Sequence, residues 1–271
     1  MVYWQKCCNF ARVKIKEVLS ALERFAPLPL QEDWDNAGLQ VGLTEAEASG
    51  ALLCLDVNEA IVDEAVARGC NLIVSHHPLL FRGLKCISDA DYVQRAVIKA
   101  IKHDICIVSM HTNMDNARGG VNFKMAEKLG LKDVRFFAEK AGMDAGSGVV
   151  GEFPEPMSAR DFVAFVKKAF GVECAMCNEL LQRPIKRVAI CGGAGDFLLP
   201  QAVQQQADAF ITGEMHYHVY FGMEQKIQIC VIGHYQSEQY TSEIFKSIIS
   251  EACAELPVYQ TATNTNPIIY L

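Results

Sequence analysis

Apolar residues are spaced so that short strands and longer helices alternate along most of the chain. Short apolar runs predict strands, and stretches with apolar residues three or four positions apart predict helices. The predicted strands span residues 51–55, 72–75, 105–109, 187–191, 209–212 and 228–232. The predicted helices span residues 58–69, 91–101, 121–129, 158–171, 198–206, 215–225 and 237–254. This alternation is typical of an α/β fold with mainly parallel sheets covered by helices.

End signals support two of these helices in particular. Asn58 stands where a helix N-cap is expected, and Gly69 follows the last apolar position of the same helix. Ser158 and Asp161 form a capping-box-like start, and Gly171 ends that second helix. The caps therefore agree with the periodicity.

The pattern falls into two halves. The segment from Arg135 to Met157 is richer in glycine, proline and charge than its surroundings, so we place a lobe boundary there. We expect an N-terminal α/β lobe over residues 14–134 and a C-terminal α/β lobe over residues 135–271.

Composition narrows the class of protein and its partners. The chain has 271 residues, 51% of them hydrophobic and 21% charged, which suits a globular protein with a substantial core. A net charge of −7 argues against a nucleic-acid partner, because no excess of Lys and Arg is present to neutralise phosphates. The longest apolar runs are too short to span a membrane, and residues 1–16 lack the apolar core of a secretory signal.

The cysteines indicate a reducing compartment. They number eleven and are scattered, and Cys54, Cys106, Cys191 and Cys230 lie in apolar strand-like runs. The pair Cys174 and Cys177 has CxxC spacing, which fits a redox motif or half a zinc site, but without a second pair a structural role is favoured. We expect a cytoplasmic protein.

Two adjacent histidines follow a predicted strand in the motif Ser75-His76-His77-Pro78. Proline keeps His77 extended, and neighbouring side chains on an extended backbone point apart. Diverging imidazoles suit two metal ions, one each, better than a single ion. The alternative is a pair of packed or surface histidines.

Two further segments carry candidate ligands directly after predicted strands. His111-Thr112-Asn113-Met114-Asp115 ends in a carboxylate, although an Asp in such a loop is often only a turn former or helix cap. His234 and Glu238 are four residues apart, so both lie on one face of a first helical turn, where two side chains can chelate a metal. Glu also complements the helix dipole at that position.

Together these segments predict a dinuclear site made of His76, His77, Asp115, His234 and Glu238. All three lie at the strand edge where α/β sheets bind ligands. Three imidazoles and two carboxylates suit two divalent ions that share carboxylates, about 3.5–4 Å apart. The set fits zinc, manganese, iron, cobalt or nickel, and it disfavours copper(I) and magnesium.

Two weaker candidates also follow predicted strands. Gly192, Gly193 and Gly195 precede a helix, so their N–H groups are candidates for anion binding, with tight packing as the alternative. Glu214 and His218 are expected on one face of a helix, as a general base or as groups that orient ligands, with capping and surface exposure as alternatives.

Six motifs in order give the chain a family resemblance from about residue 14 to the C-terminus. They are Trp34-Asp35-Asn36-Ala37-Gly38-Leu39-Gln40-Val41-Gly42, Ser75-His76-His77-Pro78-Leu79, His111-Thr112-Asn113-Met114-Asp115, Cys191-Gly192-Gly193-Ala194-Gly195, Thr212-Gly213-Glu214, and Gly233-His234 with Glu238. The chain resembles the NGG-interacting-factor-three-like family, whose bacterial members are often called GTP cyclohydrolase 1 type 2 homologues.

The resemblance implies two related α/β lobes that face one another across a dinuclear metal site, assembled into a homohexamer. It carries the ligand role onto the same five residues, with Glu238 or Asp115 bridging the metals. Residues 135–186 leave no room for the extra domain that some family members insert, so the compact form is expected. Residues 1–13 match nothing in the family pattern.

Two functions remain open from the sequence. The first is a metal-dependent hydrolase that acts on a nucleotide or another phosphorylated small molecule, with GTP suggested by the resemblance and with Glu214 or His218 moving a proton. The second is a non-catalytic role in metal storage, metal delivery or regulated protein binding.

Overall fold

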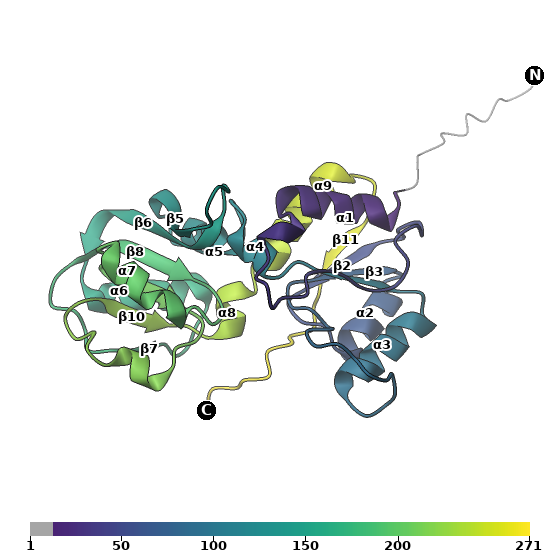
Figure 1. The fold of residues 1–271 in the computed structure, drawn as a ribbon. Coiled ribbons are helices and arrows are strands. Elements are labelled where there is room, and N and C mark those ends of the chain that lie inside the picture. Colours follow the sequence, from purple (N-terminus) through teal and green to yellow (C-terminus); the bar gives the residue numbers. More distant parts are fainter. Residues whose placement is uncertain (1–12) are drawn as a thin grey trace, which may run out of the picture.

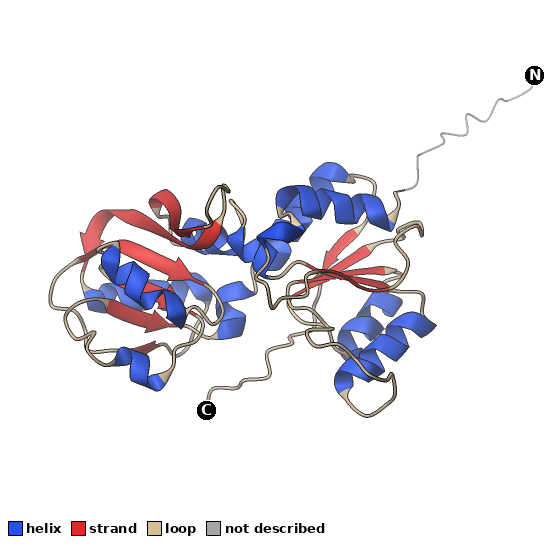
Figure 2. Ribbon diagram, viewed as in Figure 1, coloured by secondary structure: helices blue, strands red, loops and turns tan. Residues whose placement is uncertain are grey.

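The computed structural model describes residues 13–271, which form two α/β lobes with one sheet each (Figures 1 and 2). The first sheet has the strand order β1-β4-β3-β2-β11. Its strands are β1 (Gly38–Val41), β2 (Ala51–Cys54), β3 (Leu72–Ser75), β4 (Cys106–Ser109) and β11 (Val258–Gln260). Every neighbouring pair is parallel except β1 with β4. Because β2, β3 and β4 are fully buried, their sequences are apolar at every position except the last residues of β3 and β4, Ser75 and Ser109.

Helices cover both faces of this first sheet. The helices α1 (Ile15–Phe25) and α9 (Thr241–Ala252) pack on one face, while α2 (Glu59–Ala67) and α3 (Tyr92–Lys102) pack on the other (Figure 1). The side chain of Asn58 accepts a hydrogen bond from the N–H of Ile61, which confirms the predicted cap.

The second sheet has the order β5-β6-β8-β9-β10-β7. Its strands are β5 (Lys132–Glu139), β6 (Gly146–Met157), β7 (Met176–Cys177), β8 (Ile185–Cys191), β9 (Ala209–Thr212) and β10 (Gln228–Val231). Only β8, β9 and β10 run parallel, and the other three pairings are antiparallel. The expectation of mainly parallel sheets therefore holds for the first lobe, whereas the second sheet is mixed.

Helices also cover both faces of the second sheet. The helices α5 (Val121–Lys128) and α6 (Ala159–Phe170) bury apolar side chains in one core, and α7 (Leu199–Gln204) does so in the other. The cap of α6 is confirmed, since the Ser158 side chain accepts a hydrogen bond from the N–H of Asp161 and Gly171 ends the helix at φ 64°.

The division expected near residue 135 lies close to the start of β5, but the structure differs from the expectation in two respects. The segment 135–157 is not a connection, because it lies within the antiparallel pair β5–β6 at one edge of the second sheet. The chain also returns to the first lobe near its end, where α9 packs in the core with α1 and β11 pairs with β2. The first lobe is thus built from both ends of the described chain.

Smaller differences concern the segments beside the site. The predicted helix 215–225 is replaced by the single 3-10 turn η3 (Tyr217–Tyr220), and the predicted helix 237–254 is divided into α8 (His234–Glu238) and α9. The loop after β4 contains the short helix α4 (Thr112–Asn116). Further 3-10 turns are η1 (Leu28–Leu30) and η2 (Asp196–Leu198).

Two expectations drawn from composition can be compared with the fold. The nine cysteines within residues 13–271 are all free thiols. Across the same residues, no helix has the length and apolar character needed to cross a bilayer.

Candidate metal centre

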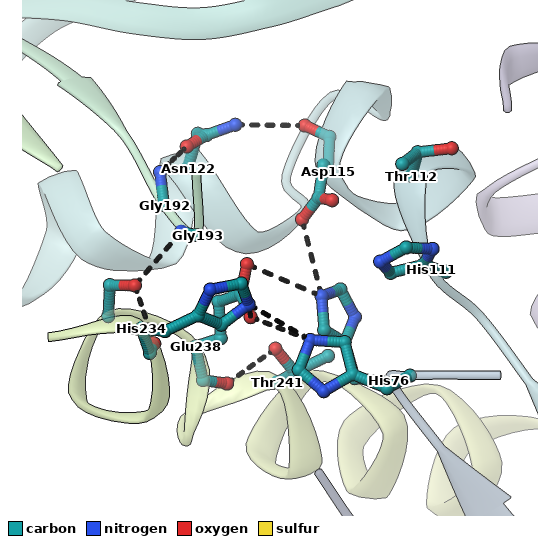
Figure 3. A network of polar contacts seen from close by, with 12 residues as sticks. His76, His111, Thr112, Asp115, Asn122, Gly192, Gly193, His234, Glu238 and Thr241 are labelled. Carbon is teal, nitrogen blue, oxygen red and sulfur yellow. Dashed lines mark hydrogen bonds and ion pairs between the residues drawn. The ribbon is translucent and has the colours of Figure 1, made fainter. Parts of the chain in front are cut away.

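Five side chains predicted as ligands meet where the two lobes face each other. Figure 3 shows His76, Asp115, His234 and Glu238 pointing toward one another. His76 and His77 directly follow β3, and Asp115 lies in α4 after β4. His234 and Glu238 lie in α8, which follows β10 of the second sheet. Distant parts of the chain therefore supply one cluster of nitrogen and oxygen atoms.

The carboxylate of Glu238 lies at the centre of this cluster. Its Oε2 is 3.0 Å from Nε2 of His77 and 3.1 Å from Nε2 of His234. Its Oε1 is 3.7 Å from Nε2 of His76, which is also 3.7 Å from Oδ1 of Asp115. The two oxygens of Glu238 thus belong to two different groups, each of which could hold a metal ion: His77, His234 and Glu238, and His76, Asp115 and Glu238.

The other ring nitrogen of each histidine is held by an oxygen outside the cluster, so that all three Nε2 atoms point inward. These contacts are His76 Nδ1 with the Met110 carbonyl (2.9 Å), His77 Nδ1 with Asp56 (2.7 Å) and His234 Nδ1 with Glu214 (2.9 Å). Oxygens in this position fix the tautomer and orientation of a metal-binding imidazole.

His111 is a residue that the sequence interpretation missed as a possible ligand. It forms a third group with His76 and His77 in which the candidate ligand atoms lie within 4.8 Å of one another. Its Nδ1 lies 2.7 Å from Oδ1 of Asp35. Burial raises the pKa of Asp35, but hydrogen bonds with His111 and Thr112 outweigh that effect and lower it to about 2. Both residues stand in the quoted family motifs, and this is the sequence signal by which they could have been found.

Two buried polar atoms of the cluster have no hydrogen-bond partner, namely Nε2 of His76 and Oδ1 of Asp115. An unpartnered buried polar atom is costly, and native proteins rarely tolerate one without a reason. Burial lowers the pKa of His76 to about 4, so its imidazole is neutral and has a lone pair to share. A cation between these two atoms would satisfy both.

The other two histidines of the cluster are in the doubly protonated, positively charged form at neutral pH when no metal is bound. Burial lowers the pKa of His77, but hydrogen bonds to Asp56 and Glu238 outweigh it and raise the pKa to about 10. The same balance, with Glu238 as the main partner, raises the pKa of His234 to about 9. A divalent cation would replace these positive charges beside the same carboxylate, so the donor set fits metal binding.

The glycine segment packs against the cluster, which corrects its interpretation as an anion site. The N–H groups of Gly192, Gly193 and Gly195 already donate to side-chain oxygens of Asn122, Ser237 and Thr212, respectively. Gly193 has φ +59°, and a Cβ there would lie 2.3 Å from Oε1 of Glu238. Glycine is needed here because the backbone approaches the Glu238 carboxylate closely.

Glu214 and His218 do not share a helical face, because the backbone at Glu214 is not helical and η3 begins only at Tyr217. Glu214 orients His234, as described above. His218 is exposed and its ring contacts Tyr217 and Phe221, away from the cluster, so its placement does not support a role as a base.

A cavity of about 470 Å³ opens over the cluster, within the range of small-molecule sites. Both lobes line it, with Trp34, Phe81 and His111 from the first and Gly193 and Phe197 from the second. The candidate ligands at its base are His77, Asp115, His234 and Glu238.

Comparison with known proteins identifies relatives over most of the chain. A Clostridium perfringens protein named GTP cyclohydrolase 1 type 2 homolog is 36% identical over 228 residues, covering 83% of this chain and 87% of the relative. A Lactococcus lactis protein of the same name is 31% identical over 259 residues, covering 94% and 98%. The crystal structure of Staphylococcus aureus hypothetical protein SA1388 superposes with a TM-score of 0.88 at 29% identity, covering 95% of this chain and 99% of that one.

The match to a described family is equally broad. The family Duf34/NIF3 (NGG1p interacting factor 3) matches residues 13–267, which include every motif quoted above. The chain therefore belongs to the Duf34/NIF3 family.

Proposed function

We propose that this protein binds two divalent metal ions per chain and is a metal-dependent hydrolase of a nucleotide or another phosphorylated small molecule. The observation that carries the proposal is the position of Glu238, whose two carboxylate oxygens face two separate sets of ligand atoms. One ion would be held by His77, His234 and Oε2 of Glu238, and the other by His76, Asp115 and Oε1 of Glu238.

Bound divalent ions would supply Lewis acidity at the base of the cavity. The protein contributes the fixed geometry, because Asp56 and Glu214 orient His77 and His234. Names of relatives such as GTP cyclohydrolase 1 type 2 homolog favour a nucleotide such as GTP as the first substrate to test.

Metal analysis and an activity screen test this proposal together. Protein purified without added metal is analysed for zinc, manganese, iron, cobalt and nickel, and metal-loaded protein is tested on a panel of nucleotides and phosphoesters. We expect two equivalents of metal and turnover of one panel member. Glu238→Ala should remove both, whereas Tyr217→Ala, an exposed change outside the cavity, should alter neither. Turnover that survives Glu238→Ala would contradict the mechanism.

A second candidate is metal storage or delivery without catalysis, or a regulatory protein-binding role. The observation that favours it is that the polar side chains around the cluster are engaged in hydrogen bonds with other parts of the protein. The described polar residues that line the cavity outside the metal-capable groups all form hydrogen bonds within the protein: Glu32, Thr112, Asn116, Asn122 and Ser147. Glu32 is the one carboxylate among these residues, and its Oε1 is held by Asn116 and Lys140. This candidate function predicts readily exchanged metal with no turnover.

The resemblance also motivates proposals about assembly and location. We propose a homohexamer in the cytoplasm, with a small-molecule ligand in the cavity. Light scattering on the eluate of a size-exclusion column measures the assembly directly. A mass of one 30.0 kDa chain would contradict the hexamer.

A further inference from the structure

Three large aromatic side chains remain exposed around the cavity over the candidate metal centre. The exposed fraction is 61% for Trp34, 46% for Phe81 and 62% for Phe197, and all three line the cavity. Exposed aromatic groups that gather at one concave site form an apolar surface suited to a ligand.

Two of these rings, Trp34 and Phe81, contact each other and together form an aromatic wall of the cavity beside His111. The ring centroids of Trp34 and Phe81 are 5.8 Å apart, and both rings lie close to His111, at 6.0 Å and 6.2 Å. The loop that carries Trp34 is fixed, because Asp35 accepts hydrogen bonds from Thr112 and Asn36 donates one to the Leu80 carbonyl. These contacts hold the backbone beside both rings.

Phe197 supplies an aromatic ring from the second lobe. It lies in η2, directly after the glycine segment that packs against Glu238. Within residues 13–271, the Phe197 ring has no aromatic partner. The cavity is therefore lined by Phe197 from the second lobe and by the Trp34–Phe81 pair from the first.

We propose that Trp34, Phe81 and Phe197 form a stacking site for a planar heteroaromatic ring, such as a nucleobase, in the ligand that reaches the metal centre. The inference rests on the proposed function and deepens it by naming the part of the substrate that the cavity selects. Aromatic side chains bind nucleobases by stacking on their faces, and this interaction depends little on which base is bound. Nearby polar groups are engaged with one another, as Asn116 shows by bonding Leu30, Glu32 and Ser147, so the ring is held by its faces rather than its edge.

Guanosine and ribose 5-phosphate separate the aromatic contribution from the phosphate contribution. In a Trp4→Phe background, Trp34 is the only tryptophan, so its fluorescence reports directly on the cavity. We expect guanosine to quench this fluorescence and ribose 5-phosphate to leave it unchanged. Calorimetry then gives the guanosine affinity of each variant without relying on Trp34.

The variants are chosen at exposed positions, where folding is least affected. Trp34→Ala and Phe197→Ala should each weaken guanosine binding roughly tenfold, the order expected for the loss of one stacking partner. Trp34→Phe should retain most of the affinity because it keeps a ring. Tyr217→Ala removes an exposed aromatic ring outside the cavity and should change nothing.

The results distinguish failure of the stacking site from failure of the hydrolase. If guanosine binds no better than ribose 5-phosphate, or if Trp34→Ala and Phe197→Ala bind it like the parent protein, the stacking site is wrong even where turnover depends on Glu238. If the variants behave as expected while no panel compound is turned over, the stacking site stands and the hydrolase proposal fails.

Discussion

Thr265 donates a hydrogen bond of 2.8 Å to Oδ2 of Asp56, whose Oδ1 lies 2.7 Å from Nδ1 of His77. The C-terminal segment thereby contacts the carboxylate that orients one imidazole of the candidate metal centre. Residues separated by most of the chain length thus act on one ring.

Replacing Asp56 should weaken metal binding without removing a ligand. Carboxylates that orient metal-binding histidines contribute about 10–100-fold to metal affinity, so Asp56→Ala should cost an amount in that range. Thr265→Val should cost less, because Asp56 keeps its contact with His77. Competition with a chromophoric chelator measures both affinities. Thr261→Val is the matched control, since it alters the same C-terminal segment at its contact with Glu64 instead. An Asp56→Ala variant that holds metal as tightly as the parent would refute the positioning role.

Gly193→Ala should damage the site through a direct clash. The added Cβ would meet Oε1 of Glu238, and the positive φ adds strain of about 1 kcal/mol. Gly171→Ala provides the control, because Gly171 has nearly the same φ, +64°, with nothing within 4 Å of an added Cβ. We expect both variants to lose stability in a denaturant titration, and only Gly193→Ala to lose metal affinity as well. Equal metal affinity in the two variants would argue against the clash.

Acid should release the C-terminal segment through Glu64. Burial raises the pKa of this carboxyl, but hydrogen bonds from Thr261, Ala262, Thr263 and Arg68 outweigh it and lower the pKa from 4.5 to about 2. Because the folded-state pKa is depressed, the stabilisation is complete above pH 4.5 and is lost as the pH falls toward 2. The shift corresponds to at most about 3 kcal/mol. Limited proteolysis of the segment across this range measures the release, and Glu64→Gln should remove the pH dependence.

Metal addition should stabilise the folded protein. A ligand that binds only the folded state at 100 times its dissociation constant adds about 2.7 kcal/mol, which corresponds to a rise in Tm of roughly 5–10 °C at this chain length. Thermal unfolding with and without zinc or manganese tests this, with chelator treatment as the reversal. Glu238→Ala should show no rise, and a rise of equal size in that variant would place the metal elsewhere.

The convergence of His76, His77, Asp115, His234 and Glu238 could be predicted from the sequence more completely than the course of the chain through the two lobes. His76, His77, Asp115 and His234 follow buried strands, and strand ends are readable from short apolar runs. The pair β5–β6 was missed because its glycines, prolines and charges resemble a connection, although its partners on β8 hold it in the sheet. The pairing of β11 with β2 joins residues far apart in the chain, so the local pattern of apolar and polar residues cannot predict it. His111 was missed because its role depends on Asp35, which is far away in the chain.

The return of the chain to the first lobe has a mechanical consequence. Two covalent connections join the lobes, one before β5 and one from β10 to α9, and α8 forms part of the second. His234 and Glu238 lie on this second connection, where Glu214 and Gly193 of the second lobe contact α8 through His234 and Ser237. Any ligand that moved the lobes apart would draw these two side chains away from His76 and Asp115, and it would thereby open both groups of candidate ligand atoms together.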